Sequence, residues 1–316
     1  MTTSDFRDPR LTEQRNPRTE RIDVAGALEI VDLMNAEDAG VADAVRAERE
    51  RIARAIELVV AALQQGEGEG EGGRLIYVGA GTSGRLGVLD AAECPPTFGT
   101  PPTMVVGVIA GGYGALVKSI EGAEDDVNAG AAVMDTAAVT AHDVVVGIAA
   151  SGTTPYVRAA LSRAQTLGAR TVLVTCSLPP QVLTDTCDVV IQPVVGPEAV
   201  TGSTRLKAGT ATKLVLNTIS TGAMIRLGKV YGNLMVDLMA LSDKLKDRGE
   251  RIVMECGGVD RGRARAAIDE AGGSVKLAIV MVRRGVGREE ARRLLEVGGG
   301  FVRPAAGDPP PVVPRP

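Results

Sequence analysis

An apolar run, a glycine-rich loop and a helix-forming segment follow one another early in the chain, and this order restricts the possible folds more than any other feature. Residues 75–78 predict a buried strand, residues 79–84 a loop, and residues 85–93 a helix that Pro95 and Pro96 end. The unpaired N–H groups of such a loop and the positive end of the helix point to the same place. This stretch therefore predicts an anion site at the end of a strand.

The loop matches the Gly-x-Gly-x-x-Gly pattern of dinucleotide-binding domains, but we reject a dinucleotide site. That pattern requires an acidic residue about 20 positions on, at the end of the next strand, to hold the ribose. The next predicted strand, residues 104–109, is followed by Ala110 and two glycines without a carboxylate. Adjacent hydroxyls in the loop suit a phosphate monoester better, with a simple tight turn as the alternative. The phosphate-binding candidates are Gly81, Thr82, Ser83 and Gly84.

A second loop of the same kind follows another apolar run, residues 144–148. Pro155 is suited to the first position of the helix after this loop. Either loop alone also fits a Ser/Thr turn that caps a helix. Together they predict that two neighbouring strands bind one phosphate at their carboxyl ends, where ligands bind in open parallel sheets. The candidates in the second loop are Ser151, Gly152, Thr153 and Thr154.

Alternating strand and helix patterns predict an α/β fold of three layers, with a five-stranded parallel sheet covered by helices on both faces. The expected strands are residues 75–78, 104–109, 144–148, 171–175 and 189–192. Helices are expected at 22–35 and 37–65, and the apolar stripe of the second must be buried on the sheet domain or on another subunit, so we expect a homodimer. The predicted boundaries are 1–65 for an N-terminal segment and helices, 66–243 for the sheet domain, 244–303 for a small helical domain and 304–316 for a disordered tail.

The composition excludes several classes of function. Aromatic residues make up 2% of the 316 residues and the formal net charge is −4, so no nucleic-acid partner is expected. No apolar run approaches a membrane span and the N-terminus is polar, so we expect a cytoplasmic protein without a membrane partner. The four cysteines form no Cys-x-x-Cys pair and His142 is the single histidine, which argues against a disulfide framework, a metal site or a Ser-His-Asp triad. Acid–base chemistry would then depend on carboxylates or lysines, and no cofactor is expected.

A polar loop at residues 193–209 precedes a helix from residue 210 and should reach the rim of the same pocket. Lys207 and Arg205 are candidates to meet a charge on the ligand, and Glu198 is a further candidate contact. Solvated or helix-capping roles are the alternative for these side chains.

Several segments, taken together, resemble the family of N-acetylmuramic acid 6-phosphate etherases. They are residues 78–87, 93–97, 121–125, 147–153 and 201–210, and the resemblance covers residues 11–301 in order with little insertion. The resemblance implies a sugar isomerase (SIS) domain with N-terminal helices and a C-terminal helical domain similar to ubiquitin-associated domains. It also implies a homodimer that cleaves the D-lactyl ether of the sugar phosphate to N-acetylglucosamine 6-phosphate and D-lactate, in recycling of cell-wall sugars.

The chain departs from this family in three places. Ser177 stands where members commonly have Asn, which puts a ligand contact from that loop in doubt. The Gly-Glu linker after Gln65 is longer than usual, and the Pro-rich tail is peculiar to this chain.

Two glutamates are suited to the cleavage of an ether, which needs a base on one side and an acid for the leaving oxygen. Glu93 is expected at a helix end, where the negative end of the helix dipole favours the protonated carboxyl. Glu124 is expected on a helical stretch, with like charges at Glu121 and Asp125 that also favour protonation. The residues alone leave Glu121 an equal choice and a solvated acidic face open. The resemblance implies that the catalytic acid maps onto Glu93 and the second acid/base onto Glu124.

Two other functions stay open at this point. One is a non-catalytic sugar-phosphate sensor similar to the glucokinase regulator, and the other is an aldose–ketose isomerase of a sugar phosphate. The pair of Glu93 and Glu124 favours an enzyme over a sensor, and neither alternative would release D-lactate. A DNA-binding regulator would need a basic helix-turn-helix, which the sequence lacks.

Overall fold

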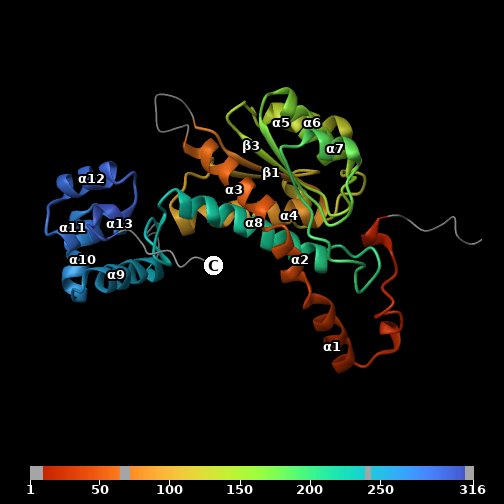
Figure 1. Ribbon diagram of the computed structural model, residues 1–316, viewed down its shortest axis with the longest axis horizontal. Coiled ribbons are helices and arrows are strands. Elements are labelled where there is room, and N and C mark those ends of the chain that lie inside the picture. Colours follow the sequence, from red (N-terminus) through yellow and green to blue (C-terminus); the bar gives the residue numbers. More distant parts are fainter. Residues whose placement is uncertain (1–9, 65–71, 239–242, 310–316) are drawn as a thin grey trace, which may run out of the picture. The chain divides into compact units, whose positions relative to one another are not determined.

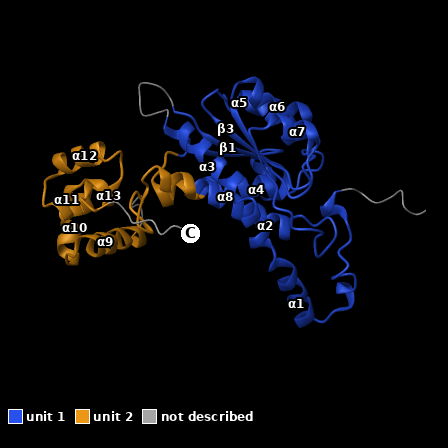
Figure 2. Ribbon diagram, viewed as in Figure 1, with its two compact units in different colours: residues 1–92, 102–220 blue, residues 93–101, 221–316 orange. Residues whose placement is uncertain are grey.

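The structure is a computed structural model that describes residues 10–64, 72–238 and 243–309. Most of the predicted Gly-Glu linker and the last residues of the predicted tail lie outside these ranges. The chain divides into two compact units (Figure 2). The first comprises residues 1–92 and 102–220, and the second comprises residues 93–101 and 221–316. The domain boundaries drawn from the sequence stay a prediction.

The first unit is built on the five-stranded parallel sheet that the sequence predicts, within one or two residues at each end. The strands are β1 (Leu75–Gly79), β2 (Val105–Ile109), β3 (Val144–Ile148), β4 (Arg170–Val174) and β5 (Val189–Ile191), in the order β2-β1-β3-β4-β5. The strand order reverses at β1 and β3, whose last residues, Gly79 and Ile148, pair with each other. A reversal of this kind opens a crevice outside the carboxyl ends of the two strands.

Helices cover both faces of this sheet (Figure 1). On one face lie α5 (Val127–Thr136), α6 (Pro155–Thr166) and α7 (Gln181–Thr186), and on the other α3 (Arg49–Gln64), α4 (Gly81–Phe98) and α8 (Lys207–Arg226). The strand residues alternate between two cores, so that Ile76 and Val78 pack with Leu161 of α6 on the first face. Tyr77 points to the second face, where its hydroxyl donates to Asp90 of α4 at 2.8 Å. The predicted three-layer architecture is confirmed.

The N-terminal helices differ from the prediction. The described part begins with short 3-10 turns at Leu11–Glu13 and Ile22–Val24, followed by α1 (Ala27–Asp38) and α2 (Val41–Ala47). The long helix expected at 37–65 is divided into α2 and α3 at Glu48. The Glu48 carboxylate accepts a hydrogen bond from the backbone N–H of Gln192 at 3.0 Å, which ties this break to the end of β5.

Helix α4 does not end before its prolines, as predicted, but continues through Pro95 and Pro96 to Phe98. The two prolines remove backbone donors, yet their fixed φ is compatible with a helix. Gly99 closes the end, because its N–H donates to the Pro95 carbonyl at 3.0 Å.

The second unit is mostly helical and has its own core. Its elements are a hairpin of β6 (Val230–Tyr231) and β7 (Leu234–Met235), then α9 (Asp243–Gly257), α10 (Arg261–Glu270), α11 (Val275–Arg284), α12 (Arg288–Val297) and α13 (Val302–Ala305). Ala278, Ile279 and Val280 of α11 are fully buried in this core. Described structure continues past the predicted boundary at 303, since α13 includes Pro304 and the Tyr231 hydroxyl donates to Asp308. The likeness to ubiquitin-associated domains stays a prediction.

Candidate active site

The predicted glycine loop is largely the first turn of α4, which begins at Gly81. Its N–H groups therefore belong to the helix turn that lacks intrahelical acceptors. A side chain on Gly84 would approach the Gly79 carbonyl oxygen to 2.7 Å and the Ile109 side chain to 2.6 Å. The glycines thus let the start of the helix lie directly on β1. Thr82 and Ser83 present half-buried hydroxyls in the same turn.

The second hydroxyl-rich loop joins β3 to α6 and folds back on itself. The Ser151 and Thr153 hydroxyls are 3.1 Å apart, and the Thr153 N–H donates to Ser151 Oγ at 3.3 Å. Gly152 has a φ of +72°, which glycine adopts without strain. Thr154 precedes α6 without capping it through its side chain. The prediction that the two loops follow neighbouring strands is confirmed, and their binding of phosphate stays a prediction.

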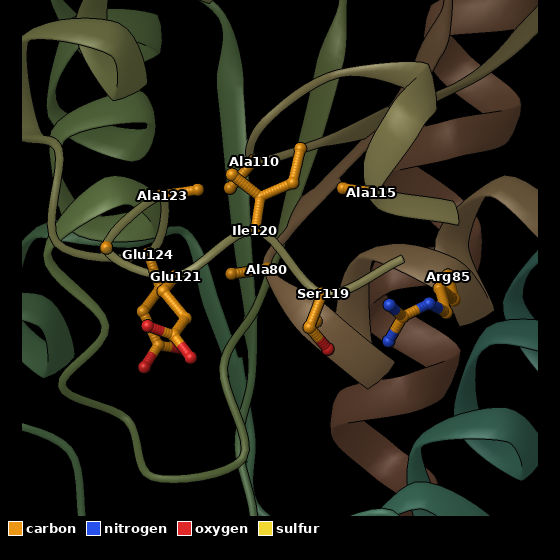
Figure 3. A pocket seen from close by; sticks show the side chains of 11 residues that line it. Ala80, Arg85, Ala110, Ala115, Ser119, Ile120, Glu121, Ala123 and Glu124 are labelled. Carbon is orange, nitrogen blue, oxygen red and sulfur yellow. The ribbon is translucent and has the colours of Figure 1, made fainter. Parts of the chain in front are cut away.

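A cavity of about 230 Å³ opens beside the start of α4 (Figure 3). From the β1–α4 junction it is lined by Ala80, Gly81 and Arg85. The connection from β2 to α5 supplies the rest of the lining, which is Ala110, Ala115, Ser119, Ile120, Glu121, Gly122, Ala123 and Glu124. Of the predicted site residues, the cavity brings together Gly81 and Glu124, while the predicted hydroxyls lie outside its lining.

Glu124 lies in a series of turns at residues 121–125 and not on a helix, which corrects the prediction. Glu124 is exposed, and Figure 3 shows its carboxylate at the same side of the cavity as the carboxylate of Glu121. The backbone of Glu124 is fixed, because its carbonyl accepts a hydrogen bond from the N–H of Tyr156 in the first turn of α6 at 3.0 Å. The β2–α5 connection is thereby attached to the end of the second hydroxyl-rich loop.

Glu93 has no place in this cavity. It is an exposed residue of α4 and belongs to the second compact unit. Because α4 continues to Phe98, Glu93 is not at the helix terminus, and the argument from the helix dipole is wrong for this residue. Its role as the acid stays a prediction.

Glu198 and Lys207 are buried at the start of α8 and are bound to other parts of the chain. The Glu198 carboxylate accepts the N–H groups of Lys207 and Ala208 at 2.9 and 3.0 Å. Burial raises the pKa of Glu198, although these donors favour its charged form. The Lys207 ammonium donates to Glu37 at 2.5 Å, and hydrogen bonds from Arg18, Lys207 and Asn16 lower the pKa of Glu37 to about 2 against the opposing effect of its burial. Both predicted ligand contacts therefore have structural partners, while Arg205 is exposed.

Reasoning from the sequence missed Arg85 and Ser119 as residues that line the cavity. Arg85 is the residue directly after the glycine loop, one helical turn from Gly81. This spacing could have predicted that its side chain lies beside an anion site. Ser119 lies in the irregular connection from β2 to α5. The sequence of this connection has no periodic pattern that would predict which way the Ser119 side chain points.

Within the described ranges, no group of three or more His, Cys, Asp or Glu side chains is arranged to hold a metal ion. No described helix is both long and apolar enough to cross a membrane. His142 is exposed in the turn before β3.

Comparison with solved structures finds chains that resemble this one in structure at low sequence identity. A putative phosphosugar isomerase involved in capsule formation from Bacteroides fragilis matches with a TM-score of 0.48 and 20% identity, over 64% of this chain and 91% of that chain. The protein c3406 of E. coli CFT073 matches with a TM-score of 0.45 and 20% identity, over 64% of this chain and 93% of that chain.

Comparison of sequences gives a closer result. Residues 51–165 match the family model of the glucokinase regulatory protein N-terminal SIS domain. The N-acetylmuramic acid 6-phosphate etherase of Serratia proteamaculans is 52% identical over 93% of this chain and 97% of its own length. The etherase of Yersinia pestis is 52% identical over 93% of this chain and 98% of its own length. The chain belongs to the family of N-acetylmuramic acid 6-phosphate etherases.

Proposed function

We propose that this chain is a carbon–oxygen lyase that cleaves the D-lactyl ether of N-acetylmuramic acid 6-phosphate, giving N-acetylglucosamine 6-phosphate and D-lactate. The observation that carries this proposal is the 52% identity to such etherases over nearly the whole length of both chains. The position of Glu124 at a cavity beside the start of α4 agrees with it. We place the reaction in the cytoplasm, where phosphorylated amino sugars from the cell wall would be recycled.

The phosphate of the substrate is proposed to lie at the crevice between β1 and β3. The first turn of α4 offers unpaired N–H groups and the hydroxyls of Thr82 and Ser83. The Ser151–Thr154 loop offers further hydroxyls from the neighbouring strand. A phosphate monoester has three oxygens that accept several such donors.

The reaction is proposed to proceed by elimination and addition. In the ring-opened sugar the C1 aldehyde acidifies the C2 proton, which a base removes. The electron pair forms the C2–C3 double bond as the C3–O bond breaks, and an acid protonates the departing ether oxygen to give lactate. Water then adds, with its hydroxyl at C3 and a proton at C2, to form N-acetylglucosamine 6-phosphate.

Glu124 is proposed as the base at C2. Its main chain is fixed to the first turn of α6 next to the proposed phosphate loop, and its carboxylate is accessible from the cavity. Glu121 lines the same cavity and is the second candidate for this step.

Glu93 is proposed as the acid, supplied by a second copy of the chain in a homodimer. Glu93 is exposed and outside the lining of the cavity that holds Glu124. Leu89, one helical turn before it on α4, is 53% exposed, and Leu28 and Val31 of α1 are 76% and 53% exposed. Leu28 and Val31 are three positions apart on one helix, and an exposed apolar pair of this kind is typical of a surface that packs against another subunit.

Mixing two inactive variants tests this arrangement. If Glu93 acts on the partner's substrate, a dimer of one Glu93→Gln chain and one Glu124→Gln chain keeps one intact site. A random mixture of the two variants then recovers about a quarter of wild-type activity. If each chain supplied both groups to its own site, every site in the mixture would lack one of them and the mixture would stay inactive.

The activity itself is tested by incubating the purified chain with N-acetylmuramic acid 6-phosphate and assaying D-lactate. Release of D-lactate together with N-acetylglucosamine 6-phosphate is the expected result. A sensor would bind the sugar phosphate and an isomerase would interconvert an aldose and a ketose phosphate, and in both cases no D-lactate would form.

A further inference from the structure

Arg85 supplies the positive charge in the lining of the cavity that holds Glu124. Its Nε donates to the Leu116 carbonyl at 3.0 Å, which fixes the guanidinium at the side of the β2–α5 connection. Among the described residues, no carboxylate forms an ion pair with it and no acceptor binds its two terminal nitrogens. Arg85 is half-buried, and its guanidinium lies at the cavity with two terminal nitrogens that no described residue binds (Figure 3).

Figure 3 shows how the charges of the cavity are distributed. The guanidinium of Arg85 and the side chain of Ser119 lie toward one side, and the carboxylates of Glu121 and Glu124 lie at the other. An anion that enters this cavity is attracted to the Arg85 side and repelled from the Glu121 side. The arrangement thus fits a ligand that has an anionic group at one end and the reacting carbons toward the glutamates.

The phosphate is not the best match for this arginine. The proposed phosphate donors include the loop after β3, and β3 lies on the opposite side of β1 from β2. The Nε of Arg85 donates to the carbonyl of Leu116, in the segment that follows β2. The guanidinium is therefore held on the β2 side of the crevice, away from the loop after β3. The substrate of the proposed reaction has a second anion, the carboxylate of its lactyl group, which lies two bonds from the ether oxygen.

We propose that Arg85, assisted by the hydroxyl of Ser119, forms a subsite for the carboxylate of the lactyl ether and so determines the specificity of the enzyme. The proposal rests on the proposed etherase function and adds a residue to it. A guanidinium binds a carboxylate through two parallel N–H···O bonds, which fixes both position and orientation. This ion pair between Arg85 and the lactyl carboxylate would hold the leaving group while the C3–O bond breaks. It cannot form with the product sugar phosphate, because that product lacks a carboxylate.

The experiment compares the substrate with an analogue in which the lactyl carboxylate is a carboxamide. Formation of N-acetylglucosamine 6-phosphate is followed for both compounds, because both release the same sugar. The wild-type kcat/KM is expected to be about 10- to 100-fold higher for the carboxylate. In Arg85→Met this ratio is expected to fall to within about twofold of one, mainly through loss of activity on the carboxylate.

Lys118→Met is the matched control, since Lys118 is an exposed cation of the same connection outside the cavity lining. It should keep the wild-type ratio. Inhibition by N-acetylglucosamine 6-phosphate should change by less than about twofold in Arg85→Met, because this ligand has no carboxylate. An equal loss of affinity for this inhibitor would assign Arg85 to the phosphate instead.

A wild-type ratio that persists in Arg85→Met, or a ratio near one in the wild type, would overturn the proposal. If Arg85→Met fails to fold, Arg85→Lys is measured in its place. Lysine keeps the positive charge but lacks the two parallel N–H donors, so the ratio of kcat/KM for carboxylate over carboxamide should be intermediate. A wild-type protein that produces N-acetylglucosamine 6-phosphate from neither compound would instead contradict the proposed function.

Discussion

The backbone N–H of Tyr156 donates to the carbonyl oxygen of Glu124 at 3.0 Å, and this bond joins two parts of the candidate site. Tyr156 is the second residue of α6, directly after the hydroxyl-rich loop that follows β3. Glu124 lies in the turns that precede α5 and lines the cavity beside α4. A proposed base and a proposed phosphate loop thus share a fixed main-chain connection although they follow different strands.

Glu124→Gln should remove the base while it keeps the shape of the side chain and the main-chain bond. Exchange of the C2 proton of the sugar phosphate with deuterated solvent, followed by NMR, is expected to slow by about 10²- to 10⁴-fold. Asp125→Asn is the control, since Asp125 is exposed and outside the cavity lining, and it should change exchange by less than about tenfold because it removes only a neighbouring charge and not the base. Undiminished exchange in Glu124→Gln, with loss in Glu121→Gln, would move the role to Glu121.

Glu93→Gln should abolish release of D-lactate while the sugar phosphate still binds. The neutral amide cannot protonate the departing oxygen, and the proposed phosphate donors are untouched. Turnover measured by D-lactate and affinity measured by titration with N-acetylglucosamine 6-phosphate separate the two effects. Near-normal turnover in this variant would exclude Glu93 as the acid.

Gly152→Ala should disturb the second hydroxyl-rich loop. At a φ of +72° an added Cβ is strained, and it would also lie 3.0 Å from both Pro179 Cα and Thr175 Oγ1. Gly196→Ala is a matched control, because Gly196 has a φ of +71° and open space where the Cβ would be. We expect a loss of about 1–2 kcal/mol in the free energy of unfolding for Gly196→Ala and a larger loss for Gly152→Ala, with a raised KM. Equal effects in urea unfolding would show that the close contact has no cost.

Glu37→Gln should destabilise the attachment of α1 to α8. The change leaves the buried ammonium of Lys207 without its carboxylate, which costs about 3–5 kcal/mol in unfolding free energy. Asp32→Asn, at an exposed position of the same helix, should change stability by less than about 0.5 kcal/mol.

The pH dependence of this difference follows from the lowered pKa of Glu37. Because that pKa is about 2 in the folded chain, below its ordinary value of 4.5, the stabilising contribution is present above pH 4.5. It is lost as the pH falls toward 2. Unfolding curves of the wild type and Glu37→Gln should therefore converge in acid, and a constant difference from pH 7 to pH 3 would contradict this assignment.

The parts of the fold that depend on local pattern could be predicted from the sequence. The central strands β1 and β3 are short apolar runs that are buried along their whole length. The glycines after β1 are needed because a Cβ on Gly79 would lie 2.7 Å from the Gly84 nitrogen. The end of α4 could not be predicted, because the preference of proline to end helices was overridden at Pro95 and Pro96.

The side-chain partners of the site depend on contacts between distant segments. Lys207 has the pattern of a ligand-binding cation, but its partner Glu37 is far away in the sequence. Glu124 was expected on a helical stretch, whereas it lies in a turn and its carbonyl is bound to the N–H of Tyr156. The place of Arg85 depends in the same way on the Leu116 carbonyl.

The chain is proposed to break the C3–O bond of its substrate by elimination, and the fate of water oxygen tests this most directly. In H₂¹⁸O the purified chain should give N-acetylglucosamine 6-phosphate labelled at C3, distinguished from the exchangeable C1 oxygen by fragment masses, and D-lactate with no label. Label in the hydroxyl of lactate, or no D-lactate at all, would contradict the account.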